Sequence, residues 1–362
     1  MKILIASNMD SGKPYGNFTR PFYLGQELSK HAEVLQLGYD CSRVYYAPSL
    51  SAKSYSVLNY IKFIRRASRD FRPDIIYSQE NRPNISSYIF SHLRGGYRHV
   101  FDFHASPAFE YKENGFALKR IRAATIEKKL LSSGNAIILA SDYLKKTIIR
   151  EYGEINNDRW HVVPNGVPSS LLEMGKAVES PYKKIKGGVA LAIAPRNFHS
   201  NVESVRFLIE VAKISLDKSP LTFVILGGGP ELPAPTNVVY AGHVDDIIPY
   251  IDYADICLSP YPGHAVCGGA RNKVFDFFAR KKVVLSTENG VSGIQEAEHL
   301  KNVYVSLDDP VIFAKDLANL SRNISMHSNI GDEAFTLVSE KYNWRRSANR
   351  LLEVFQTIMK VR

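Results

Sequence analysis

The sequence predicts an α/β protein with two doubly wound parallel sheets in tandem, and three observations support this fold class. The chain has 362 residues, which suits two domains because a domain usually takes roughly 100 to 200 residues. Short apolar runs alternate with stretches of helical periodicity, a pattern typical of parallel strands joined by crossover helices. The alternation pauses after residue 167 and restarts near residue 188.

The elements follow in order along the chain. In the first half we expect strands at 2–7, 33–38, 74–79, 99–104, 136–141 and 161–166. In the second half we expect strands at 188–194, 222–227, 238–242, 256–261 and 282–287. The P-N-G-V-P turn and the polar stretch after it have the composition of a hinge. We therefore place one domain at 1–167, a second at 168–340 and a terminal helix at 341–362.

Composition excludes several classes of protein. The chain is 45% hydrophobic and 23% charged, as expected for a globular protein rather than a disordered one. Its longest apolar runs are far shorter than the ~18 residues of a transmembrane helix, and the first strand is too short for a signal peptide. The three cysteines, Cys41, Cys257 and Cys267, lack a metal-binding spacing. We therefore expect a cytoplasmic protein without a metal site.

Basic charge is concentrated in the first half of the chain. Residues 1–165 carry 24 Lys and Arg against 15 Asp and Glu, so they hold +9 of the net +10. Basic residues recur at Lys62, Arg65, Arg66, Arg69, Arg72, Lys119, Arg120 and Arg122. This asymmetry indicates an anionic partner, which could be phospholipid headgroups, a phosphorylated acceptor or nucleic acid. A solvated basic surface is the alternative.

Two glycine-rich turns do not match the dinucleotide or P-loop fingerprints. The turn after the first strand contains Gly12 and Gly16, and the second domain contains G-G-G-P at 227–230. Neither has the G-x-G-x-x-G or G-x-x-x-x-G-K-[ST] spacing. The sequence therefore argues against a nicotinamide-dependent enzyme.

The densest group of candidate binding residues lies at 260–294. A Gly-Gly-Ala turn at 268–270 is followed by Arg271 and Lys273 at the start of a helix. Exposed backbone N–H groups, two cations and the helix dipole together favour a bound diphosphate. Cations are unfavourable at a helix N-terminus, so a bound anion explains them better than helix stability does. The alternative is that both side chains point to solvent.

These motifs resemble those of the GT-B glycosyltransferases of family 4. The segment N-K-V-F-D-F-F-A-R-K-K-V-V-L-S-T resembles the family's K-V-L-E-A-M-A-x-G-K-P-V-V-A-T, with Lys273 at the lysine and Asp276 at the second glutamate of its E-x7-E pair. Upstream, V-I-L-G-G-G-P-E and V-V-Y-A-G-H-V resemble its glycine turn and base-binding loop. H-V-F-D-F-H and H-V-V-P-N-G-V match the first domain and the interdomain segment.

The resemblance implies an architecture and a set of site residues. Two Rossmann-like domains would face a cleft, the first binding an acceptor and the second a nucleotide-sugar, and the C-terminal helix would return to the first domain. The implied catalytic residues are His104, beside the transferred sugar, and Arg196 and Lys273, at the diphosphate. The implied donor-binding residues are Gly16, Asn197, Gly228, His243, Val244, His264, Gly268, Gly269, Ala270 and Asp276.

The chain departs from the family pattern at three positions. Gly268 stands where the first glutamate of the E-x7-E pair would contact the donor sugar, and His264 is a candidate substitute. Arg196 is present, but no lysine follows at 201 or 202 to complete the family's R-x5-K pair. The second glutamate of the pair is replaced by the shorter Asp276, which is still suited to accept hydrogen bonds from a ribose diol. Its alternative role is that of a surface carboxylate facing Arg280 one turn later.

The function implied is transfer of a sugar from a UDP- or GDP-sugar to a hydroxyl of a glycan or lipid-linked acceptor, with retention of configuration. Such reactions build cell-surface polysaccharides or glycolipids. No metal or cofactor is expected, since the nucleotide-sugar is a substrate. An anionic membrane surface at the inner face of the membrane is the expected partner of the basic half, and no nucleic acid is expected. The alternatives are a sugar-nucleotide epimerase of the same fold and a non-enzymatic nucleic-acid-binding protein.

Overall fold

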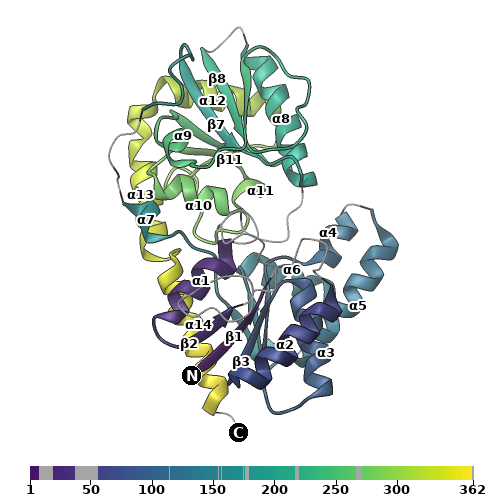
Figure 1. Ribbon diagram of the computed structural model, residues 1–362. Helices are drawn as coiled ribbons and strands as arrows, with labels where there is room; N and C mark the ends of the chain where they lie inside the picture. Colours follow the sequence, from purple (N-terminus) through teal and green to yellow (C-terminus); the bar gives the residue numbers. More distant parts are fainter. Residues whose placement is uncertain are drawn as a thin grey trace. The chain divides into compact units, whose positions relative to one another are not determined.

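The computed structural model describes residues 1–7, 19–36, 56–113, 115–153, 155, 157–173, 175, 179–216, 220–265 and 271–360. The chain forms two compact units. Unit 1 comprises Met1–Asn165 together with Trp344–Arg362, and unit 2 comprises Gly166–Asn343. Figure 1 shows the elements of both.

Unit 1 contains a six-stranded parallel sheet in the order β2-β1-β3-β4-β5-β6. The strands are β1 Lys2–Ala6, β2 Glu33–Gln36, β3 Ile75–Gln79, β4 Arg98–Phe103, β5 Ala136–Leu139 and β6 Trp160–Val162. The helices are α1 Thr19–Ser29, α2 Val57–Phe71, α3 Asn81–Leu93, α4 Pro107–Glu113, α5 Ala117–Ser133, α6 Asp142–Tyr152 and α14 Trp344–Lys360. The chain reverses direction across the sheet between β1 and β3, where ligands of such sheets bind.

Alternate strand residues of unit 1 face opposite helical layers. Ile3 and Ile5 pack with α1 and α14, whereas Leu4 and Ala6 pack with α2 and α3. The C-terminal helix α14, yellow in Figure 1, lies against α1. The ring of Phe355 meets the ring of Tyr77 edge-on at 5.5 Å between centroids. The predicted return of the terminal helix to the first domain is therefore confirmed.

Unit 2 contains a second six-stranded parallel sheet, in the order β12-β11-β10-β7-β8-β9. Its strands are β7 Gly188–Ile193, β8 Leu221–Leu226, β9 Val238–Gly242, β10 Ile256–Ser259, β11 Val284–Thr287 and β12 Tyr304–Ser306. The helices are α7 Ser169–Leu172, α8 His199–Ser215, α9 Ile248–Asp252, α10 Asn272–Ala279, α11 Glu288–Val291, α12 Pro310–Arg322 and α13 Ser328–Glu340. Here the direction reverses between β7 and β10. The sequence predicted the first five of these strands and missed the short edge strand β12.

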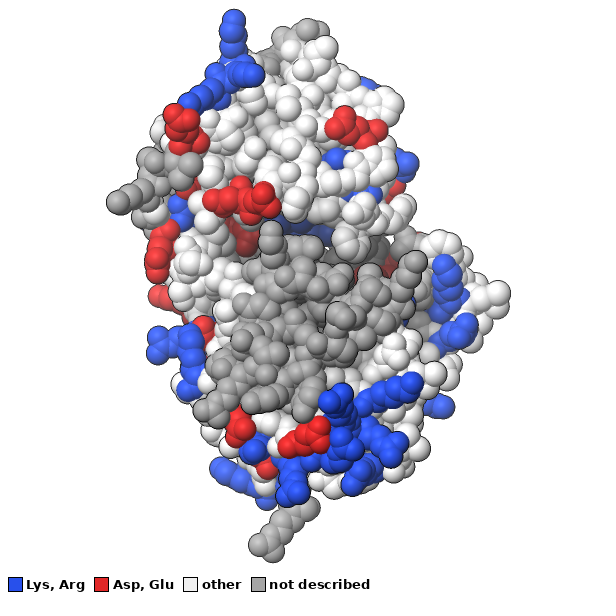
Figure 2. All heavy atoms as spheres, in the orientation of Figure 1, with Lys and Arg blue, Asp and Glu red and all other residues white. Residues whose placement is uncertain are grey.

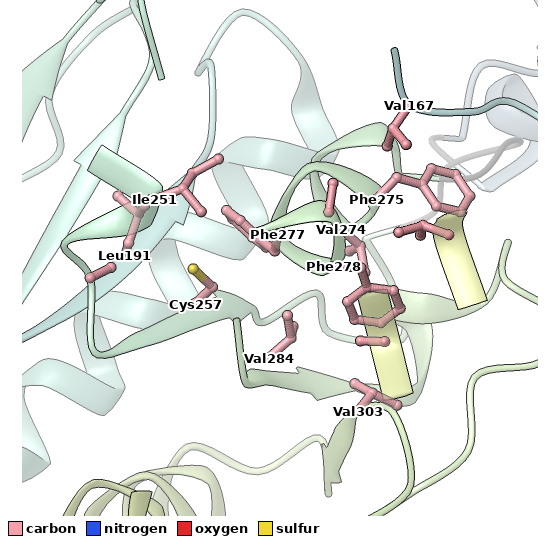
Figure 3. Packing of buried hydrophobic residues seen from close by; sticks show 14 of the residues in the cluster. Val167, Leu191, Ile251, Cys257, Val274, Phe275, Phe277, Phe278, Val284 and Val303 are labelled. Carbon is pink, nitrogen blue, oxygen red and sulfur yellow. The ribbon is translucent and has the colours of Figure 1, made fainter. Parts of the chain in front are cut away.

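The core of unit 2 fixes the position of α10, which carries Lys273. Val274, Phe277 and Phe278 are fully buried on one side of this helix. Figure 3 shows them facing Cys257 of β10 and Val284 of β11. Since these aromatic side chains bury large apolar areas, the first turn of α10 is held at the carboxyl edge of the sheet.

The fold class predicted from the sequence is confirmed: two doubly wound parallel α/β units follow one another along the chain. Within the ranges described above, no helix is long and apolar enough to cross a membrane.

Candidate functional site

The ammonium group of Lys273 lies where the chain direction reverses in the sheet of unit 2. It donates hydrogen bonds to the backbone oxygen of Ile193 at the end of β7, to the hydroxyl of Tyr261 after β10, and to Asn201 Oδ1 at 3.1 Å. The Tyr261 hydroxyl in turn donates to Asn201 Oδ1 at 2.6 Å. The sequence singled out Lys273 but neither of its side-chain partners. An apolar strand followed by Pro-Tyr was the only available signal for Tyr261.

Arg271 stacks on the ring of Tyr261. Its guanidinium group is 3.3 Å from the centroid of the Tyr261 ring and donates to the backbone oxygens of Asn289 and Ala265. Only 6% of Arg271 is exposed. Neither Arg271 nor Lys273 points to solvent, so the alternative interpretation of these cations is wrong. Tyr261 contacts both cations, Arg271 through its ring and Lys273 through its hydroxyl.

Arg196 follows β7 and supports the glycine turn at 227–230, which follows the neighbouring strand β8. Its guanidinium donates to the backbone oxygens of Pro230 at 2.7 Å and Gly229 at 3.1 Å, and lies 4.8 Å from the ring centroid of Tyr240. Gly229 has a φ of 108°, and a Cβ there would come within 2.9 Å of Arg196 Cβ. Only glycine allows this close packing. Its Nη1 also donates to the backbone oxygen of Ala194 at 3.4 Å, so within the described part of the chain three of its five N–H donors are used.

Asp276 follows Lys273 on α10 and is partly buried. Burial raises the pKa of its carboxyl group to about 7, and the nearby charge of Lys273 opposes the rise. Arg280 does not pair with it, because Arg280 binds Asp252 through two bonds of 2.6 Å. The predicted alternative, a surface pair between Asp276 and Arg280, is therefore wrong. The carboxyl group makes no hydrogen bond within the described part of the chain, so it is free to bind a ligand.

The other predicted donor-binding residues of unit 2 lie at the same edge of its sheet. Asn197 and His243 are exposed after β7 and β9, and Val244 packs against the core. The Gly228 carbonyl accepts a hydrogen bond of 2.8 Å from the backbone of Arg196. His264 is 68% exposed, and its Nε2 is 3.2 Å from Glu203. The remaining predictions, Gly16, Gly268, Gly269 and Ala270, lie outside the described residues.

In unit 1, His104 lies just after β4. Its Nδ1 is 3.7 Å from Glu80 and its Nε2 is 3.9 Å from Asp102. Burial lowers the pKa of the imidazole to about 4, although Asp102 opposes this. His104 is therefore neutral near pH 7. Its placement beside a transferred sugar stays a prediction.

Sequence reasoning missed a buried ion pair beside His104. Arg20 Nε lies 2.9 Å from Asp102 Oδ2, and Arg20 Nη1 donates to Asn165 Oδ1 at 3.0 Å. Tyr77 also donates to Asp102 Oδ2. Asp102 could have been found, because strand residues two apart share a face of the sheet and His104 is two residues later. Nothing near Arg20 in the sequence indicates its partner.

Among the described residues, no group of three or more His, Cys, Asp or Glu could hold a metal ion. In the part of the chain that the structure describes, the charged side chains at the unit 2 site include Lys273, Arg271, Arg196 and Asp276. This arrangement is suited to an anion with a polar group attached, such as a nucleoside diphosphate.

Comparison with solved structures gives the same fold. Sucrose-phosphate synthase from Thermosynechococcus elongatus aligns with a TM-score of 0.78 at 12% identity, over 100% of this chain and 99% of that one. HepE from Anabaena in complex with UDP-glucose aligns with a TM-score of 0.73 at 15% identity, over 99% and 100%. A glycosyltransferase from Rickettsia africae gives 0.70 at 15% identity, over 100% and 99%. The fold is that of the GT-B glycosyltransferases.

Comparison with protein-family profiles identifies the family within this fold. The profile "Glycosyltransferase Family 4" matches residues 23–171, and "Glycosyl transferases group 1" matches residues 190–323. The chain belongs to this family of glycosyltransferases, which confirms the resemblance seen in the sequence. A search of curated proteins gives no match.

Proposed function

We propose that the protein transfers a sugar from a nucleotide diphosphate sugar to a hydroxyl group of a glycan or lipid-linked acceptor. The observation that carries the proposal is the placement of Lys273, Arg271 and Arg196 at the carboxyl edge of the unit 2 sheet. Helix N-termini and cations at this edge are the usual site of a diphosphate in doubly wound folds. We assign donor binding to unit 2 and acceptor binding to unit 1.

In this proposal the cations stabilise the leaving group. As the bond between sugar and phosphate breaks, negative charge grows on the departing diphosphate, and donors already held in place stabilise that charge. Tyr261 and Asn201 hold the ammonium of Lys273, so little reorganisation is needed when the charge develops. One such donor is worth about 3 kcal/mol of the barrier. We propose that these protein cations act without a metal ion or cofactor, and that configuration is retained as in the related enzymes.

Asp276 is proposed to recognise the nucleoside. When ionised, its carboxylate accepts two hydrogen bonds from the ribose diol, and it makes no competing bond in the described part of the chain. The complex of HepE with UDP-glucose favours UDP as the first nucleotide to test. GDP is the second.

The basic helices of unit 1 are proposed to hold the enzyme at an anionic membrane surface. The basic residues of α2 are exposed, while its apolar side is buried. Phe116, which precedes helix α5, and Leu118 and Ile121 in its first turns are 50%, 81% and 63% exposed. Figure 2 shows Lys and Arg gathered over α2, α3 and α5 on this face. Exposed apolar residues interleaved with cations favour a lipid surface over a soluble polyanion. A site on the cytoplasmic face of the membrane is part of this proposal.

The first test is thermal stabilisation by UDP, GDP, ADP and NAD, each with and without EDTA. A ligand at about 100 times its Kd stabilises by about 2.7 kcal/mol, which is readable as a shift of Tm. We expect a shift with UDP or GDP that EDTA does not change. Stabilisation by NAD alone would contradict the proposal. Analysis of donor products without acceptor then separates a transferase from an epimerase.

A further inference from the structure

Glu80 has a backbone conformation that only glycine adopts readily. It follows β3 and precedes α3, with a φ of 70° and a ψ of 173°. A residue with a Cβ rarely occupies this region, and doing so shifts the folding equilibrium towards the unfolded chain by roughly 5- to 150-fold. Such strain persists only where the surrounding structure enforces it, and it is concentrated at functional sites.

Local structure does not account for a glutamate at this position. Glu80 is the N-cap residue of α3, but its side chain makes no capping hydrogen bond. A negative charge near a helix N-terminus is favourable by only about 2- to 5-fold, which is less than the strain costs. Glycine is an acceptable N-cap residue and would relieve the strain. Stability alone therefore favours glycine here.

Hydrogen bonds hold the strained backbone against the end of β4. The Glu80 backbone N–H donates to the backbone oxygen of Asp102 at 3.1 Å, and Asn84 Nδ2 donates to the same oxygen at 2.9 Å. The backbone N–H of Asn84 donates to the Glu80 backbone oxygen at 3.0 Å, and Asn84 is fully buried. Glu80 is thereby fixed beside the end of β4, close to His104.

The carboxylate of Glu80 lies beside the imidazole of His104. Its Oε1 is 3.7 Å from His104 Nδ1, and the two side chains are 16% and 18% exposed. Burial lowers the pKa of the imidazole to about 4, so near pH 7 the ring is neutral and carries one N–H. An ionised carboxylate only accepts hydrogen bonds, so Glu80 favours the tautomer with this proton on Nδ1.

Asp102 is the competing carboxylate, at the other ring nitrogen. Its Oδ1 is 3.9 Å from His104 Nε2. The charge of Asp102 is already compensated, because Oδ2 accepts hydrogen bonds from Arg20 Nε at 2.9 Å and from the hydroxyl of Tyr77. A compensated carboxylate attracts an imidazole N–H less strongly. Within the described part of the chain, His104 Nε2 has no hydrogen-bond partner.

We propose that Glu80 is a positioning residue that holds the proton of His104 on Nδ1 and leaves Nε2 as a hydrogen-bond acceptor towards the substrate. This rests on the proposed function, in which His104 lies beside the transferred sugar. A hydroxyl group of the bound sugar can then donate to Nε2, and Glu80 acts only through His104. The strain at residue 80 is offset by a fixed orientation and tautomer of the imidazole.

The test is NMR of the full chain with ¹⁵N-labelled histidine side chains, at pH 7. Long-range couplings show which ring nitrogen carries the proton, and the signals lost in His104→Gln identify His104. We expect the Nδ1–H tautomer in the wild-type protein. Glu80→Gly should convert most of His104 to the Nε2–H tautomer while Tm stays the same or rises, a combination that a structural role would not produce. Glu80→Gln keeps an acceptor oxygen and should preserve the wild-type tautomer.

Turnover of a nucleotide-sugar is the functional measurement. Glu80→Gly should lower kcat about tenfold, as expected for the loss of one oriented hydrogen bond, with the KM for the donor little changed. Glu80→Gln should retain most of the kcat. Leu300→Gly is the matched control, since Leu300 also has a positive φ, of 63°, but is 49% exposed in a turn of unit 2. It should leave both the His104 tautomer and kcat unchanged.

Three results would overturn the inference. The first is a His104 that is not the Nδ1–H tautomer in the wild-type protein or that does not change in Glu80→Gly. The second is a large fall in the Tm of Glu80→Gly, which would make Glu80 a structural residue. The third is a wild-type kcat in Glu80→Gly. A wild-type protein that turns over no nucleotide-sugar would count against the transferase instead, and the tautomer would still decide the role of Glu80.

Discussion

Lys273 and Asn201 are joined by a hydrogen bond of 3.1 Å between Nζ and Oδ1. The chain has no lysine at 201 or 202, where the family's R-x5-K pair would place a second cation. Asn201 instead holds the one ammonium group, together with Tyr261. At this position the chain therefore has a neutral amide that helps to hold Lys273 in place of a second cation.

Replacing Lys273 by alanine should lower kcat by about two decades, because one preorganised donor to the leaving group is worth about 3 kcal/mol. The measurement is steady-state turnover with the nucleotide-sugar identified by thermal shift. Lys213→Ala is the control, since Lys213 is an exposed residue of α8 that pairs with Glu210. Near-normal turnover of Lys273→Ala would refute the assignment.

Tyr261→Phe should have a smaller effect, about tenfold on kcat, because it removes only the hydroxyl that positions Lys273. The ring stays under Arg271, so the fold and Tm should change little. The decisive measurement is a double-mutant cycle. In a Lys273→Ala background the Tyr261 substitution should add almost nothing. Additive effects of the two substitutions would mean that Tyr261 acts elsewhere.

Affinity for UDP should fall as pH falls through about 7. Burial raises the pKa of Asp276 to about 7, so the carboxylate is ionised above this pH and protonated below it. Only the ionised form accepts both hydrogen bonds of a ribose diol. The Kd of wild-type protein should rise with acidification between pH 7.5 and about 5.5. Asp276→Asn should bind more weakly at pH 7.5 and show a flatter profile. An identical pH profile would contradict the role.

The sequence predicts those features of the fold and the site that depend on residues close together in the chain. The alternation of strands and helices predicts both sheets, and the position of Lys273 after a glycine turn predicts a cation at a helix start. The structure adds what only tertiary packing brings together. Arg20 and Asp102 are 82 residues apart and Lys273 and Asn201 are 72 apart. No local pattern encodes these pairs.

Asp276 illustrates the limit of local reasoning. A spacing of four residues favours a pair between Asp276 and Arg280 on a helix surface. Arg280 is instead only 4% exposed and binds Asp252 together with the backbone of Leu171 and Glu173. Burial of the guanidinium among several acceptors outweighs the weak surface pair.

Helix α14 should be essential to unit 1. Leu351 is fully buried in the core that α14 shares with the sheet, so Leu351→Ala should cost about 2 to 5 kcal/mol. Arg350→Ala, on the exposed side, should change stability by less than about 0.5 kcal/mol. Both tryptophans, Trp160 and Trp344, belong to unit 1. Fluorescence-monitored urea unfolding therefore reports this unit alone.

Truncation after Glu340 should destabilise unit 1 more than Leu351→Ala does. It removes α14 entirely and should lower the unfolding midpoint further than Leu351→Ala. An unchanged midpoint would mean that the helix contributes nothing to unit 1.

Membrane binding should have separable charge and apolar components. The triple change Lys62→Gln, Arg65→Gln, Arg69→Gln removes three cations worth about 1 kcal/mol each near an anionic surface. It should weaken binding to vesicles of phosphatidylcholine with phosphatidylglycerol by roughly two decades at low salt.

The double change Leu118→Ser, Ile121→Ser should instead remove the binding that survives high salt, because apolar insertion is not screened. Lys213→Gln with Lys301→Gln removes exposed charge from unit 2 and is the control. The readout is co-sedimentation against phosphatidylcholine alone. Equal binding to neutral and anionic vesicles, or preference for duplex DNA over both, would contradict an anionic membrane as the partner of this basic face.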